Sequence, residues 1–117
     1  MGTTPRYPTY SEIRERRLAA RRAIARRVLE DMEALVRGEG GRLVVFGSLA
    51  EGGFGDGSDV DVAVFGVPGG RDEAVAARID EALAAAGFAA DVVTERYLTP
   101  SLRQRILDHG RAPGALG

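Results

Sequence analysis

The stretch VVFGSLAEGGFGDGSDVDVAVF, residues 44–65, joins two apolar segments through a glycine-rich loop that ends in two aspartates. Side chains alternate between the two faces of a strand, so Asp59 and Asp61 are expected to point to the same face, about 6.5 Å apart. At an effective dielectric constant of about 20, two carboxylates at that separation repel each other by roughly 2–3 kcal/mol. This repulsion favours either protonation of a carboxylate or a bound cation.

The rest of the chain alternates helical and strand patterns around that stretch. A helix is expected over residues 11–37, with Ser11 as its N-cap, because apolar residues recur at helical spacing before a glycine-rich breaker. The further strands and helices that we expect are strands at 42–46, 59–65 and 88–93 and helices at 71–87 and 99–110. This order predicts one α/β (α+β) domain at 11–110, with a small mixed sheet that carries helices on one face. Residues 1–10 are predicted to form an extended lead-in and residues 111–117 a flexible tail.

Composition narrows the chemistry that the chain can perform. The 117 residues contain no cysteine and only one histidine, His109, which excludes disulfides and thiolate zinc sites and leaves oxygen atoms to hold any metal. We expect His109 to make a favourable dipole contact at a helix end. A net charge of −1 argues against direct nucleic-acid binding. Without an apolar run of membrane-spanning length or a signal-like start, the protein is expected to be cytoplasmic, with no membrane association.

A third aspartate and a glycine–serine pair complete a candidate site. Asp91 can point to the same face as Asp59 and Asp61, and Glu95 is the alternative with the same strand parity. Carboxylates grouped in this way suit Mg²⁺, which binds through a few carboxylates and the phosphates of a substrate. Gly47 would let the backbone approach a phosphate closely, and Ser48 would add a hydroxyl donor. A metal site beside a phosphate-binding turn predicts nucleotidyl transfer from a nucleoside triphosphate.

These residues also carry a family resemblance. Gly-Ser at 47–48, ten intervening residues and Asp-Val-Asp at 59–61 resemble the motif of the minimal nucleotidyltransferases, a branch of the DNA polymerase beta-like superfamily. The resemblance covers roughly residues 24–110 and implies the palm fold of that superfamily. It implies that Gly47 and Ser48 bind the triphosphate and that Asp59 and Asp61 ligate the metals. It also implies that Asp91 completes the metal site and helps to deprotonate the acceptor hydroxyl. Many relatives carry an arginine in the turn at the position of Glu51.

The resemblance further implies a partner protein. Small members of the family are commonly paired with HEPN-domain proteins, so the expected reaction is Mg²⁺-dependent transfer of AMP from ATP to a tyrosine of a HEPN toxin, with this chain as the antitoxin. The chain is too short for a separate acceptor-binding domain, which agrees with an acceptor on another protein. Two alternatives remain. The chain could neutralise its partner by binding alone, or it could modify a small molecule of the aminoglycoside type.

The first helix carries a cluster of basic residues. Seven arginines lie within residues 14–27, and Arg14, Arg17 and Arg21 continue the helix face on which Ile24 is expected to be buried. They are candidates for contact with a partner. The other interpretation is a solvated face on which these arginines pair with nearby acids.

Overall fold

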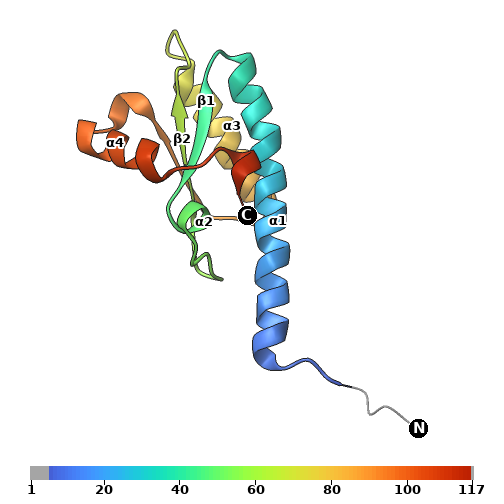
Figure 1. Cartoon of the computed structure of the whole chain (residues 1–117). Helices are drawn as coiled ribbons and strands as arrows, with labels where there is room; N and C mark the ends of the chain where they lie inside the picture. Colours follow the sequence, from blue (N-terminus) through green and yellow to red (C-terminus); the bar gives the residue numbers. More distant parts are fainter. Residues whose placement is uncertain (1–5, 117) are drawn as a thin grey trace.

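Three strands form one mixed sheet at the centre of the molecule (Figure 1). The structure, a computed structural model, describes residues 6–116. The strands are β1, Arg42–Phe46, β2, Val60–Phe65, and β3, Ala90–Thr94. The central strand β2 pairs antiparallel with β1 and parallel with β3. The predicted small mixed sheet is therefore confirmed.

Two helices cover one face of the sheet. They are α1, Tyr10–Gly38, and α3, Asp72–Ala85. Valines at alternate positions of β2 point toward them, as expected for a strand with one apolar face. The residues of this core that are at most 1% exposed include Val60, Val62 and Val64 of β2, Leu29 and Val36 of α1, and Ile79 and Leu83 of α3.

The other face of the sheet is partly covered as well, which corrects the expectation of helices on one face. Helix α4, Pro100–His109, inserts Ile106 against Val44, Ala63 and Phe65. Figure 1 shows α4 on the opposite side of the sheet from α1. The alternation of residues in β2 already indicated that the second face is partly covered, because Ala63 and Phe65 are apolar residues on the same face as Asp61. The aspartates therefore lie beyond the part of this face that α4 covers.

Helix α1 is 29 residues long, and its first half extends past the sheet (Figure 1). Its N-cap is Thr9, whose hydroxyl accepts a hydrogen bond from the Glu12 N–H, and not the expected Ser11. Its buried stripe runs through Leu18, Ala25, Leu29 and Val36, whereas Ile24 is 49% exposed. Neither α1 nor any other helix in the described part of the chain is apolar enough over a sufficient length to cross a membrane.

The end of the chain is packed, which corrects the prediction of a flexible tail for residues 111–116. Arg111 exchanges two backbone hydrogen bonds of 2.8 Å with Val45 at the outer edge of β1. A short 3₁₀ helix, η2, Pro113–Ala115, follows, and Leu116 is only 4% exposed. At the other end, the expected lead-in falls partly outside the described residues, and Tyr10 already belongs to α1.

Candidate active site

Two of the predicted carboxylates lie side by side on neighbouring strands. Asp61 of β2 and Asp91 of β3 are register partners, and paired residues of adjacent strands project to the same face. Asp59 lies just before the first residue of β2. Asp61 is half-buried, while Asp59 and Asp91 are exposed. The three aspartates therefore occupy one accessible end of the sheet.

The electrostatics of Asp61 reflect this grouping. Burial is the largest cause that raises the pKa of the Asp61 carboxyl above its usual range, and the charges of Asp91 and Asp59 raise it further. Within residues 6–116, none of the three aspartates forms an ion pair. The cluster holds negative charge that a cation would neutralise.

The donor set suits a hard divalent cation, because it consists of carboxylate oxygens on one face beside a turn that is open to phosphate. Between residues 6 and 116, no three acidic or histidine side chains are already gathered closely enough to hold a metal ion. Asp59, Asp61 and Asp91 could ligate one ion only after their side chains rotate toward it. The chemistry of the donor set thus fits a divalent metal ion.

Gly47 brings the glycine–serine turn against Asp61. Phe46, the residue before it, is the register partner of Asp61. Gly47 has a φ of 68° and a ψ of −153°, and a Cβ atom placed on it would collide with Oδ2 of Asp61. Only glycine combines this conformation with so close an approach. Ser48 follows as the first residue of the short helix α2, Ser48–Glu51, and lines a separate cavity, so Gly47 is the turn residue that the structure brings to the carboxylates.

A cavity of about 220 Å³ lies on the other side of the turn, between α2 and α4. Phe46 and Gly47 line it from the turn, Glu51 from α2, and Arg105 and His109 from α4. Gly47 lines the cavity and also lies against Asp61, so the cavity adjoins the carboxylates at the turn, although no aspartate lines it. It is smaller than the pockets that enclose whole drug-sized ligands.

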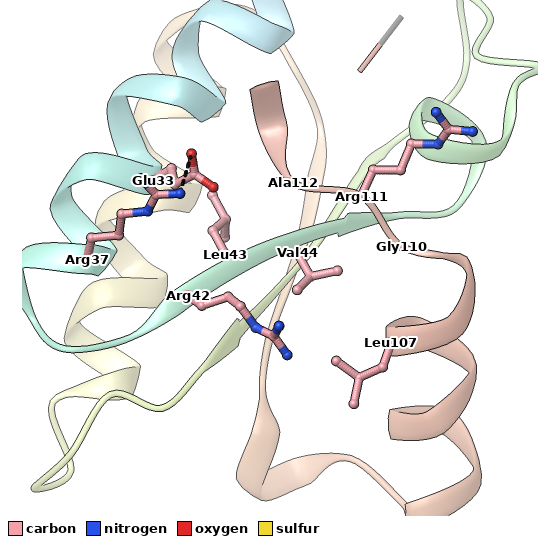
Figure 2. Close-up of a pocket in the computed structure, with 9 residues that line it drawn as sticks. All are labelled: Glu33, Arg37, Arg42, Leu43, Val44, Leu107, Gly110, Arg111 and Ala112. Carbon is pink, nitrogen blue, oxygen red and sulfur yellow. Dashed lines mark ion pairs between the residues drawn. The ribbon is translucent and has the colours of Figure 1, made fainter. Parts of the chain in front are cut away.

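Figure 2 shows another cavity, also of about 220 Å³, at the outer edge of β1. Glu33 and Arg37 of α1, Arg42 of β1 and Leu107 of α4 are among its lining residues. None of the predicted carboxylates or turn residues lines it. We therefore place the candidate site at the aspartates and not in this cavity.

Glu95, the alternative to Asp91, does not join the site. It belongs to the 3₁₀ helix η1, Glu95–Tyr97, which follows β3. Its carboxylate accepts a hydrogen bond of 2.7 Å from the Gly66 N–H and pairs with Arg103 at 3.6 Å. The parity argument failed because the strand ends at Thr94, so alternation does not continue to Glu95.

The three α1 arginines proposed for partner contact, Arg14, Arg17 and Arg21, make contacts within the chain. Arg14 and Arg17 pair with Asp56 at 3.8 and 2.9 Å, and this residue lies in the glycine-rich loop that leads to Asp59. The guanidinium of Arg21 lies 4.5 Å from the centre of the Phe88 ring. Pairing with a nearby acid, as the solvated-face interpretation expects, therefore holds for Arg14 and Arg17.

Reasoning from the sequence missed Arg105 as a site residue and assigned His109 only a dipole contact. The available signal was their spacing of four residues, which places two basic side chains on one face of α4. That spacing is common on solvated helices. The spacing of Arg105 and His109 indicates a binding site only when α4 is known to pack beside the turn.

Comparison with known proteins assigns the chain to a family. The family model of the nucleotidyltransferase domain matches residues 25–113, a range that includes the turn, the three aspartates and α4. A solved structure described as a candidate minimal nucleotidyltransferase is 32% identical in sequence, with a TM-score of 0.60. The match covers 82% of this chain and 92% of that chain. No curated protein matches. The fold, the glycine turn beside paired aspartates and this match agree, and the chain belongs to the nucleotidyltransferase domain family.

Proposed function

We propose that this protein transfers AMP from ATP to a hydroxyl group of a partner protein, with Mg²⁺ held by Asp59, Asp61 and Asp91. The observation that carries the proposal is the contact of Gly47 with Asp61, whose register partner is Asp91. It brings a turn able to bind phosphate and two carboxylates able to bind metal to the same point. Domains of this family typically use a nucleoside triphosphate and a divalent metal.

The proposed reaction is an in-line displacement at the α-phosphorus. The oxygen of the acceptor hydroxyl forms a bond to the α-phosphorus, the bond from that phosphorus to the α,β-bridging oxygen breaks, and pyrophosphate leaves. Asp91 accepts the proton of the attacking hydroxyl, and Gly47 and Ser48 hold the departing phosphates. A bound Mg²⁺ would supply charge neutralisation and alignment of the attacking and leaving oxygens.

The exposure of Asp91 supports a protein acceptor. Asp91 lies on β3, an outer strand of the sheet, and is exposed to solvent. Only the three-residue helix η1 lies between β3 and the loop before α4. A small acceptor would have little surface to enclose it on this side, whereas a tyrosine on a folded partner could reach the carboxylate. We propose a HEPN-domain toxin as that partner and an antitoxin role for this chain.

The decisive experiment uses ATP labelled at the α-phosphate and measures which molecule acquires the label. Wild-type protein, Mg²⁺ and a co-expressed HEPN partner should give labelled partner, and Asp91→Asn should stop the transfer while ATP still binds. Asp80→Asn is the matched control, because Asp80 is exposed on α3 and takes part in no ion pair within residues 6–116. Label on an aminoglycoside, with none on any protein, would show that the acceptor assignment is wrong.

Glu51 favours a second candidate function. It stands where many relatives carry an arginine, and it lines the cavity beside Gly47, where a carboxylate would repel phosphate. The alternative is an antitoxin that neutralises its partner by binding alone. In that case the partner would be inhibited without acquiring label, and Asp91→Asn would inhibit it as well as the wild type does.

A further inference from the structure

We infer that Arg105 of α4 takes the place of the arginine that the turn lacks, and that Arg105 and His109 hold the β- and γ-phosphates of the nucleotide in the cavity beside Gly47. This inference rests on the proposed use of a nucleoside triphosphate. It assigns a binding role to two residues that the motif of the family does not contain.

The position of the cavity is the first argument. Gly47 lies against Asp61 and lines the cavity together with Arg105 and His109. A triphosphate whose α-phosphate lies at the aspartates and whose chain passes Gly47 therefore enters this cavity with its terminal phosphates. The volume of about 220 Å³ leaves room for a polyphosphate group.

The absence of protein partners for the two side chains is the second argument. In the described part of the chain, neither Arg105 nor His109 takes part in a salt bridge, a side-chain hydrogen bond or a cation–π contact. In the cavity of Figure 2, Arg37 pairs with Glu33 at 3.6 Å and Arg42 lies over the Phe65 ring, while Arg111 likewise has no side-chain partner within residues 6–116. What distinguishes Arg105 is therefore that its cavity also includes Gly47. An arginine that faces a cavity with its guanidinium unpaired is suited to bidentate contact with phosphate.

The rigidity of α4 is the third argument. Ile106, next to Arg105, is 2% exposed and packs against the sheet. A Cβ atom on Gly110 would collide with the Ile106 carbonyl oxygen and with Cγ1 of Val44, so the end of α4 lies directly on β1. The backbone that carries Arg105 and His109 is thus held in place before any ligand arrives.

Direct binding of inorganic tripolyphosphate with Mg²⁺, measured by calorimetry, tests the inference without any transfer step. Arg105→Ala should weaken binding about 10- to 100-fold, the usual loss for a charge-assisted hydrogen bond, and His109→Ala should weaken it less. Arg103→Ala is the matched control on the same helix, because Arg103 pairs with Glu95 and does not line the cavity. Equal affinities of the Arg105→Ala and Arg103→Ala variants would overturn the inference, and so would absence of binding to the wild type.

A double-variant cycle then tests whether Arg105 replaces the missing arginine. Glu51→Arg should tighten tripolyphosphate binding and should make the further change Arg105→Ala less costly. If Arg105→Ala weakens tripolyphosphate binding as much in the Glu51→Arg background as it does in the wild type, Arg105 does not replace the missing arginine. The proposed function fails separately: tripolyphosphate binding that depends on Arg105, without transfer of AMP to any acceptor, would leave this inference standing and remove the enzyme assignment.

Discussion

At the scale of single residues, the candidate site depends on how closely a glycine and a carboxylate can approach. Gly47 leaves no room for a side chain beside Asp61. Any larger residue at position 47 would therefore force the turn and the Asp61 carboxylate apart. Asp61 is held half-buried next to Asp91. The site therefore carries an electrostatic cost when no cation is bound.

This cost predicts a variant that is more stable than the wild type and has lost activity. Because burial and the neighbouring carboxylates raise the pKa of Asp61 in the folded protein above its usual range, its contribution to stability is present at low pH and is lost as the pH rises through the folded pKa. Asp61→Asn should therefore raise the free energy of unfolding at pH 7 by about 1 kcal/mol, allowing for solvent screening. The gain should vanish toward pH 3, as chemical denaturation would measure. Asp59→Asn and Asp61→Asn should each abolish transfer.

Added Mg²⁺ provides the complementary measurement. It should raise the melting temperature of the wild type and of the control Asp80→Asn, but not that of Asp61→Asn. A destabilised Asp61→Asn variant at pH 7 would instead mean that the carboxylate makes a structural contact, and the metal assignment would lose its support.

At the scale of elements, α1 is divided into a part that builds the core and a part that extends beyond it. The match to the family model begins at residue 25, so Arg14, Arg17 and Arg21 precede the matched region. Arg14 and Arg17 pair with Asp56 at exposed positions, where ion pairs contribute only about 0–1 kcal/mol. Such weak pairs leave the arginines available to a partner.

We predict that charge reversal of Arg14, Arg17 and Arg21 to Glu weakens association with the partner roughly tenfold, mainly through the association rate. Arg27→Glu is a control of the same kind on an exposed position of α1. The variant Asp56→Asn distinguishes the two interpretations. It should leave partner affinity unchanged or higher if the arginines contact the partner, whereas a loss equal to that of the arginine variants would mean that they act only through the loop.

At the scale of the whole molecule, different helices cover the two faces of the sheet, and residues 111–116 connect the two sets of helices. Residues 111–116 run from α4 past the edge of β1 to α1 (Figure 1). There Arg26 donates hydrogen bonds of 2.9 and 2.8 Å to the carbonyl oxygens of Gly114 and Leu116. Leu116 completes the core on the α1 side. The segment connects α4, which carries Arg105, to the main core.

Leu116→Ala should accordingly destabilise the protein by about 2–3 kcal/mol, as for other buried leucines. Ile24→Ala is the control, since Ile24 is 49% exposed and should cost much less. Urea denaturation of both variants measures the difference. Similar midpoints for the two variants would show that residues 111–116 do not pack as described.

The sequence by itself determined the strands, the valine face of β2, the shared face of Asp61 and Asp91 and the glycine–serine turn. All of these depend on alternation, spacing and local conformation, which are properties of short segments. The family assignment followed from the same residues.

Only the tertiary structure decided where α4 lies, that the Glu95 carboxylate binds Gly66 and Arg103 instead of joining the site, and that residues 111–116 pack against β1 and α1. Each of these depends on contacts between segments far apart in the chain, such as Arg111 with Val45 and Ile106 with Ala63. No local pattern encodes such a contact, because the free energy that selects it comes from burying surfaces that meet only after the chain has folded. The cavity beside Gly47, with Arg105 and His109 facing it, belongs to this second class.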